Sequence, residues 1–175
     1  AVLKYSNTEF TLLDTPGHID FSAEAERTLQ VLDYAILVIS GADGVQGHVQ
    51  TLWKLLKRYE IPVFLFINKM DQEGTDKEAI LVELQKRLDE KCIDFSNQDE
   101  DSFVESLAMC DEVLLEKYLD GERISEKEIQ NAIQERQIFP CYFGSALKMQ
   151  GVEAFLDDFE RLTISLEYPE EFGAK

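Results

Sequence analysis

Two short, uninterrupted apolar runs constrain the fold of this chain more than any other feature of its sequence. Ala35–Ile39 lies between Asp33 and Gly41, and Pro62–Ile67 is followed directly by polar residues. Runs of this length without a polar side are typical of strands that are covered on both faces, as in a parallel sheet. Both runs are far shorter than the roughly 20 apolar residues of a membrane-spanning helix, so they predict no membrane segment.

Segments with helical spacing separate these strands. The first is expected to open at Asp20, a good N-cap residue. Three Ser/Thr-x-x-Glu capping boxes predict further helix starts, at Thr75–Glu78, Ser102–Glu105 and Ser125–Glu128. Apolar residues recur every three or four positions in four segments, which predicts four helix faces: Phe21, Ala25, Leu29 and Leu32; Val49, Leu52, Trp53 and Leu56; Ile80, Leu84 and Leu88; Val152, Phe155, Leu156 and Phe159.

Further β-type segments lie near the two ends of the chain. Val2–Tyr5 and Thr8–Leu13 flank a tight turn and predict a β-hairpin, and Ile138–Phe143 predicts another strand. Strands that alternate with helices in this way are the signature of an α/β fold. We therefore predict a mostly parallel open sheet with flanking helices.

A strongly acidic stretch interrupts the alternation of strands and helices. Residues 89–136 hold 15 acidic and 5 basic side chains, so −10 of the net charge of −18 lies there. We predict a helical insert subdomain over 91–136, which divides an α/β domain into 1–90 and 137–166. Residues 167–175 are expected to be a linker or the start of a further domain.

Charge and cysteine usage narrow the possible functions. A net charge of −18 repels phosphate backbones, so this chain is not expected to bind nucleic acid unaided. Cys92, Cys110 and Cys141 are scattered and odd in number, and they show neither the spacing of a metal site nor a disulfide framework. Together with the lack of a signal or transit peptide pattern, this fits a protein of the reducing cytoplasm.

Polar groups follow three of the predicted strands. They occupy residues 14–18 (Asp-Thr-Pro-Gly-His), 68–71 (Asn-Lys-Met-Asp) and 144–146 (Gly-Ser-Ala). In open parallel sheets, ligands bind at the carboxyl ends of the strands, which lie at one edge. We therefore expect three loops from distant parts of the chain to converge on one ligand.

The chemistry of the second and third groups suits a purine base. The Asp71 carboxylate can accept the ring N–H and the exocyclic amine that guanine offers side by side. The Asn68 amide can hold the loop and the base, and the aliphatic stem of Lys69 can lie over the ring. Ser145 and Ala146 can supply a backbone N–H to the guanine carbonyl and brace Asp71.

The first group suits phosphate chemistry. Asp14 at a strand end can hold Mg²⁺ through a water molecule. Gly17 offers a backbone N–H with no side chain in the way of a terminal phosphate. His18 can orient a water molecule for in-line attack, which would make it the catalytic residue.

The three groups, with Leu147 extending the last, resemble the third, fourth and fifth nucleotide-binding motifs of translational GTPases. The chain is most similar to the elongation factor G group, which includes the ribosomal protection proteins of tetracycline resistance. The separation of Asn68 and Ser145 by 77 positions also resembles this group, which carries an extra subdomain there. Further parts of the resemblance are residues 31–33, 43–46 and 116–119.

The resemblance implies a GTP-driven factor that hydrolyses GTP to GDP and phosphate on the ribosome. By carry-over, Asp14 would bind a water ligand of Mg²⁺, Gly17 would sense the γ-phosphate, and His18 would be the catalytic histidine. The insert over 91–136 would be a docking surface for the ribosomal stalk protein. Guanine would be read by Asn68, Lys69, Asp71, Ser145, Ala146 and Leu147.

One departure from the family is large. The sequence contains no Gly-x-x-x-x-Gly-Lys-Ser/Thr phosphate loop, so we expect a fragment that binds GTP weakly and does not hydrolyse it. The family's first strand, which would precede Ala1, lies between the strands Thr8–Leu13 and Ala35–Ile39. We expect these two strands either to close on each other or to be joined by a second copy of the chain.

A second function class remains open. The chain could be a degenerate docking module that contacts a partner through its insert and has no GTPase activity. The intact Asn-Lys-x-Asp and Asp-Thr-Pro-Gly groups favour the enzyme, because a scaffold has no need of them. A translocation factor and a tetracycline protection protein are not distinguished by these residues.

Overall fold

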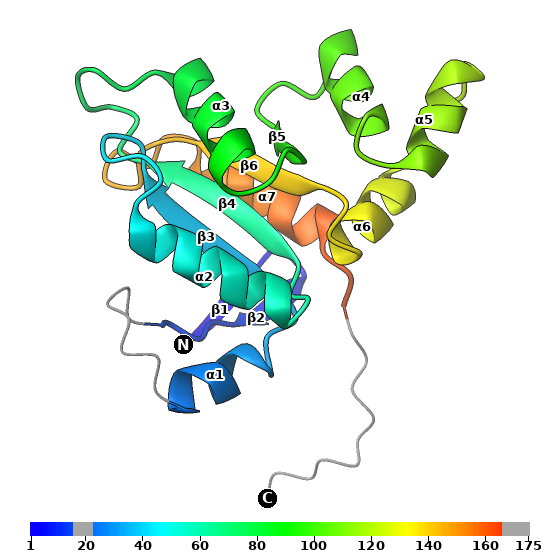
Figure 1. Cartoon of the computed structure of the whole chain (residues 1–175). Helices are drawn as coiled ribbons and strands as arrows, with labels where there is room; N and C mark the ends of the chain where they lie inside the picture. The colour runs from blue at the N-terminus through cyan, green and yellow to red at the C-terminus, as the bar shows by residue number, and fades with distance from the viewer. Residues whose placement is uncertain (16–22, 166–175) are drawn as a thin grey trace, which may run out of the picture.

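A four-stranded parallel sheet forms the centre of the computed structural model, which describes residues 1–15 and 23–165. Its strands are β3 (Ala35–Ser40), β4 (Val63–Asn68), β5 (Cys92–Asp94) and β6 (Phe139–Phe143), in the spatial order β3-β4-β6-β5. The predicted parallel α/β sheet is therefore confirmed (Figure 1). The short β5 was not predicted, because three residues inside the acidic stretch carry too little pattern to mark a strand.

The register of the sheet places three strand ends at one edge. Ser40 of β3 lies opposite Asn68 of β4, and Ile67 of β4 lies opposite Phe143 of β6. The loops that follow these strands therefore leave the sheet side by side. This edge carries the residues of the candidate site.

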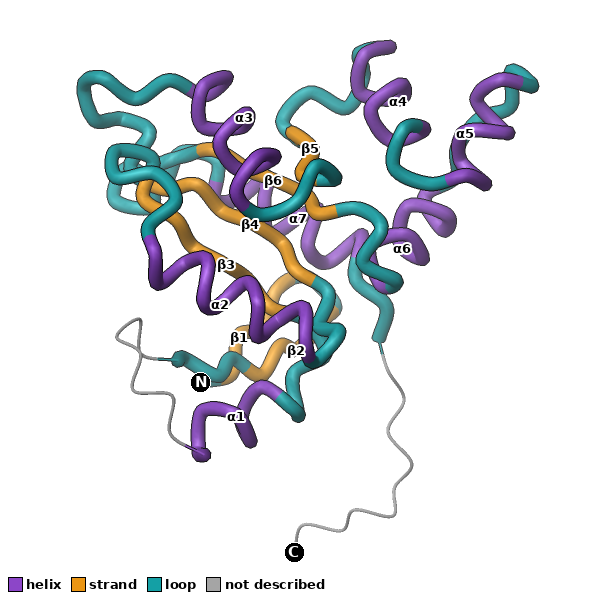
Figure 2. Tube along the Cα trace, viewed as in Figure 1, coloured by secondary structure: helices purple, strands orange, loops and turns teal. Residues whose placement is uncertain are grey.

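Helices cover both faces of the sheet, as the path of the chain in Figure 2 shows. Helices α2 (Gly47–Arg58) and α3 (Lys77–Arg87) pack on one face, and α7 (Val152–Leu162) packs on the other (Figure 1). Alternate residues of β4 divide between the two cores: Val63, Leu65 and Ile67 on the α2 side, and Phe64 and Phe66 on the α7 side. A strand that is buried on both faces explains the unbroken apolar run in the sequence.

The acidic stretch continues the core on the α7 side. After β5 it forms α4 (Asp101–Ala108), α5 (Glu112–Leu119) and α6 (Glu126–Gln134). Their inward residues join the same apolar cluster as Phe155 and Phe159 of α7, and they include Phe103, Leu107, Leu114, Ile129 and Ile133. The acidic residues thus occupy the outer surface of helices whose inner surface is apolar.

The helix starts agree only in part with the predicted capping boxes. Ser125 and Glu128 form both reciprocal hydrogen bonds of a capping box at the start of α6. The prediction at Thr75 was wrong, because Asp76 caps α3 by accepting from the Ala79 N–H. The prediction at Ser102 was also wrong, because α4 already begins at Asp101.

The β-hairpin stands apart from the main sheet. Strands β1 (Val2–Tyr5) and β2 (Thr8–Thr11) pair with each other and dock on α7. The Tyr5 hydroxyl donates to Asp157 at 2.5 Å, and the Thr8 hydroxyl donates to Glu160 at 2.9 Å. The expectation that β2 and β3 close on each other was wrong, because these bonds to α7 hold the hairpin away from β3. The joining of a second copy stays a prediction.

A short helix and several expected core residues complete the described fold. Helix α1 (Ala23–Leu29) precedes β3, and its predicted start at Asp20 lies outside the described residues. Trp53 is buried as expected, and the three cysteines are buried and free. Over residues 1–15 and 23–165, no helix has both the length and the apolarity needed to cross a bilayer.

Candidate functional site

Asn68 joins the two loops that leave β4 and β6. It is the last residue of β4, and its Oδ1 atom accepts hydrogen bonds from the N–H groups of Lys69 and Ala146, both at 2.8 Å. The first bond bends the chain sharply, and Lys69 takes a positive φ of 62°. The second bond reaches 78 positions along the sequence. One amide oxygen thus fixes both loops to the end of a buried strand.

Backbone hydrogen bonds reinforce this junction. The Met70 N–H donates to the Gly144 carbonyl at 3.0 Å, and the Gly144 N–H donates to the Ile67 carbonyl at 2.9 Å. On the opposite side of β4, the Gly41 N–H donates to the Asn68 carbonyl at 2.7 Å. The loops after β3, β4 and β6 are therefore tied together before any ligand arrives.

The loop after β6 closes on itself. Ser145 and Gln150 exchange two backbone hydrogen bonds, at 3.0 and 2.9 Å. A Cβ atom on Gly144 would lie 2.1 Å from the Gln150 carbonyl oxygen, so this position admits no side chain. Gly151 follows in the left-handed region, with φ of 74°. These glycines allow the short loop that presents residues 145–148.

Asp71 is oriented by residues of this second loop. Its carboxylate accepts a hydrogen bond from Ser145, whose whole residue is 1% exposed, and Lys148 Nζ lies 3.2 Å from Oδ2. The Ser145 bond and then the Lys148 contact lower the pKa of Asp71. The side chain of Asp71 is 19% exposed. It is therefore an ionised acceptor that is held in place but still open to a ligand.

A family model, "Elongation factor Tu GTP binding domain", matches residues 1–165 of this chain. The chain belongs to this family. Elongation factor G from Mycoplasma genitalium is 32% identical over 203 aligned positions, which cover 89% of this chain and 30% of that protein. Tetracycline resistance protein TetW from Butyrivibrio fibrisolvens is 36% identical over 170 positions, which cover 88% of this chain and 26% of that protein.

A solved structure agrees with the fold. A crystal structure of a protein from Thermus thermophilus matches with a TM-score of 0.79 and 24% identity. The match covers 98% of this chain and 32% of the other. The resemblance to the elongation factor G group, with its tetracycline resistance members, is thus confirmed by the named relatives. The chain spans about a third or less of the length of these proteins.

The predicted phosphate-side residues Asp14, Gly17 and His18 are only partly described by the structure. Asp14 is exposed beyond the end of β2, and in the described part of the chain it makes no hydrogen bond or ion pair with the Asn68 or Ser145 loops. Gly17 and His18 lie outside the described residues. No cluster of three or more His, Cys, Asp or Glu side chains suited to a metal occurs among the residues that the structure describes.

Two features of the site differ from the sequence analysis. The Ala146 N–H was expected to meet a guanine carbonyl, but in this structure it donates to Asn68. Leu147, the next residue, is 91% exposed. Lys148 was not predicted at all, although it contacts Asp71, because a single lysine after a Gly-Ser-Ala-Leu sequence carries no signal of its own.

Proposed function

We propose that the edge formed by Asn68–Asp71 and Ser145–Leu147 binds the guanine base of GTP or GDP. The observation that carries this proposal is the position of the ionised Asp71 carboxylate beside Ser145, in a junction that Asn68 holds closed. A base that binds here meets a preformed pair of loops, so little ordering is needed on binding.

Asp71 gives the proposed site its specificity. Its two oxygens can accept the ring N–H and the exocyclic amine of guanine, whereas adenine offers no such pair of donors. The Lys69 side chain is exposed beside it, and its aliphatic stem can cover the ring. Lys148 pairs with Asp71 in the structure, so a bound guanine has to share the carboxylate with this lysine or displace it.

This chain alone does not provide a complete binding site for the phosphates of GTP and for Mg²⁺. The sequence has no Gly-x-x-x-x-Gly-Lys-Ser/Thr loop, and the described residues around Asp14 form no carboxylate cluster. Asp14, Gly17 and His18 are proposed to meet Mg²⁺, the γ-phosphate and the attacking water only together with a phosphate loop. We propose that this chain alone binds GTP weakly without hydrolysing it.

The longer proteins to which this domain is related support a wider proposal. A chain that carries this domain together with a phosphate loop would hydrolyse GTP as a translation factor on the ribosome. The alternative is a docking module without GTPase activity. The ordered Asp71 carboxylate favours the GTPase over the docking module. A protein that docks through α4–α6 would have no use for the edge at Asp71.

The binding experiment compares fluorescent GTP and ATP analogues on the full chain. We expect weak binding with a clear preference for GTP, because only guanine satisfies Asp71. A version extended at its N-terminus with a phosphate-loop segment should bind GTP more tightly and release phosphate. Gln72→Ala, an exposed change in the same loop, serves as a control that keeps the preference. Equal binding of GTP and ATP by both versions would contradict the proposal.

The acidic helices supply a second surface. Met109, Val113 and Leu119 are 74%, 60% and 73% exposed on or beside α4 and α5. Apolar side chains on an acidic background suit a protein partner, and we propose the ribosomal stalk protein. Leu119→Ser should weaken capture of purified stalk protein, whereas Val82→Ser on α3 should not. If the two variants capture the stalk protein equally well, the proposed docking role of this surface is contradicted.

A further inference from the structure

Lys148 pairs with the carboxylate on which the proposed guanine edge depends. Its Nζ atom lies 3.2 Å from Oδ2 of Asp71, and Asp71 also accepts a hydrogen bond from Ser145. These two partners differ in their exposure. Ser145 is 1% exposed, whereas the Lys148 side chain is 55% exposed. Ser145 therefore fixes Asp71 from within the fold, and Lys148 covers it on the solvent side, from which a base has to approach.

The loop after β6 keeps the backbone of Lys148 beside Asp71. The Lys148 N–H donates to the Ser145 Oγ atom at 3.4 Å, and the paired backbone bonds of Ser145 and Gln150 close the loop around it. None of these bonds uses the Lys148 side chain, which is a flexible four-carbon stem with a charged end. The ammonium group can therefore leave Asp71 while the loop stays in place.

Lys148 and guanine need the same negative charge. A carboxylate has about four lone-pair sites, and guanine would direct one N–H group to each oxygen. Ser145 already takes one of the sites on Asp71, and Lys148 takes another, on Oδ2. An exposed ion pair of this kind contributes little to stability, so a base that forms two charge-assisted hydrogen bonds is able to displace the ammonium group.

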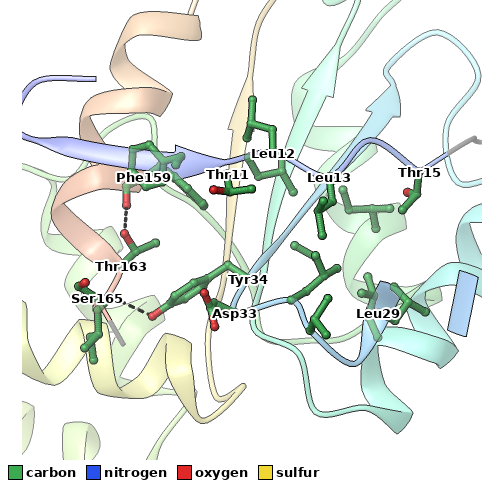
Figure 3. Close-up of a pocket in the computed structure, with 18 of the residues that line it drawn as sticks. Thr11, Leu12, Leu13, Thr15, Leu29, Asp33, Tyr34, Phe159, Thr163 and Ser165 are labelled. Carbon is green, nitrogen blue, oxygen red and sulfur yellow. Dashed lines mark hydrogen bonds between the residues drawn. The ribbon is translucent and has the colours of Figure 1, made fainter. Parts of the chain in front are cut away.

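A pocket of the chain lies away from this edge. It has a volume of about 910 Å³ and is bordered by Leu12, Leu13 and Tyr34 (Figure 3). Its described lining includes no residue of the segments 68–71 and 145–150. A nucleoside that binds in this pocket would not contact Lys148. A change in binding on substitution of Lys148 is therefore a signature of the edge at Asp71.

We propose that Lys148 is a built-in competitor of guanine at Asp71, and that guanine displaces it on binding. The inference rests on the proposed function, because it concerns the same edge. Breaking the ion pair opposes binding, so Lys148 lowers the affinity for guanine by about two- to fivefold at low salt, as expected for an exposed pair. Salt screens the ion pair and therefore strengthens the binding of an uncharged guanine ligand.

The test uses guanosine, which carries the base and no phosphate. Its binding to the full chain is measured by NMR titration at about 0.01 M and about 1 M salt, between which the screening length falls from about 30 Å to about 3 Å. The unchanged chain should bind guanosine about two- to fivefold more tightly at the higher salt. Lys148→Met should bind it more tightly than the unchanged chain at low salt, with little dependence on salt.

Two further variants separate the ion pair from other effects of the substitution. Lys86→Met removes the same charge at an exposed position in the last turn of α3, and it should bind guanosine like the unchanged chain. Lys148→Arg keeps a cation at the edge and should keep the rise in affinity with salt, which a merely structural role of the side chain would not produce. Adenosine lacks the paired N–H donors, so its binding should respond to none of these changes.

The outcomes distinguish a failure of this inference from a failure of the proposed function. If guanosine is preferred over adenosine but Lys148→Met and Lys86→Met bind it equally, the guanine edge is supported and the competition by Lys148 is contradicted. Weaker binding of guanosine by Lys148→Met would also overturn the inference, because Lys148 would then contribute to the site. If no variant prefers guanosine over adenosine, both the guanine edge and this inference are overturned.

Discussion

The side-chain oxygen of Asn68 and the backbone N–H of Ala146 are 2.8 Å apart, although 78 positions separate them in the sequence. The same oxygen accepts the Lys69 N–H, so one amide group sets the geometry of both loops. The predicted convergence of the β4 and β6 ends therefore has a specific structural cause. It depends on a residue at the last position of a buried strand.

Removing this amide should loosen the junction. Asn68→Ala leaves the Ala146 and Lys69 N–H groups without their acceptor, and we expect a loss of about 1–3 kcal/mol in the free energy of unfolding. Urea denaturation measures it, with Gln72→Ala on the same loop as the control. A loss no larger than that of the control would show that the backbone bonds alone hold the loops.

Two glycine substitutions should differ sharply. In Gly144→Ala, the new methyl group would meet the Gln150 carbonyl oxygen at 2.1 Å, and the short loop after β6 would have to shift. We expect a loss of several kcal/mol and weaker guanine binding. At Gly47, the first residue of α2, no atom lies within 4 Å of the position that a methyl group would take, so Gly47→Ala should be neutral or stabilising by up to about 1 kcal/mol. Thermal unfolding of the two variants checks this contrast.

The bond between the hairpin and α7 predicts a dependence on alkaline pH. The hydrogen bond to Asp157 raises the pKa of Tyr5 to about 12. Because the folded-state pKa is raised, the stabilisation is fully present below pH 10 and is lost as the pH rises toward 12. Difference absorbance of phenolate should show late-titrating tyrosines, because the pKa values of Tyr34 and Tyr142 are also raised, and Tyr5→Phe should remove the contribution that titrates near pH 12. An unchanged titration curve in that variant would contradict the assignment.

The buried thiols should be unreactive in the folded chain. Burial raises the pKa of Cys110 to about 11 and also raises the pKa of Cys141. Thiolate is the reactive form, so little of it is present at pH 8. A thiol reagent at that pH should modify these two cysteines slowly, and their reaction should accelerate on unfolding in urea. Fast modification of the folded chain would show that the core around α4 and β6 opens readily.

Much of the fold could be predicted from the hydrophobic pattern of the sequence. The apolar run of β4 predicted a strand buried on both faces, and the spacing of Phe155 and Phe159 predicted the packed face of α7, because periodicity directly reflects burial. Helix starts were less predictable, since Asp76 competes with Thr75 for the same cap. Strand β5 was not predicted, because its three residues are too few to show a periodic pattern. The separation of β2 from β3 depends on contacts of Tyr5 and Thr8 with α7, and long-range contacts of this kind leave no local sequence signal.

The candidate site was predictable where motif and strand end coincide. Asn68, Asp71 and Ser145 follow strands whose carboxyl ends share an edge, so their proximity follows from topology. Two contacts could not be predicted from the sequence: the ion pair of Lys148 with Asp71, and the hydrogen bond from the Ala146 N–H to Asn68. Both depend on how the loop after β6 closes. The roles of Asp14, Gly17 and His18 stay predictions.

The most direct test of the guanine-reading edge is a change of base specificity at Asp71. Asp71→Asn replaces two acceptors by one acceptor and one donor, which suits the ring N–H and the carbonyl of xanthine. Competition binding of GTP and xanthosine triphosphate is measured on the phosphate-loop-extended version, with and without the substitution. The unchanged version should prefer GTP, and the variant should reverse the preference by at least about tenfold, in line with a polar mismatch of about 1–3 kcal/mol. An unchanged preference for GTP in Asp71→Asn would show that Asp71 does not read the base.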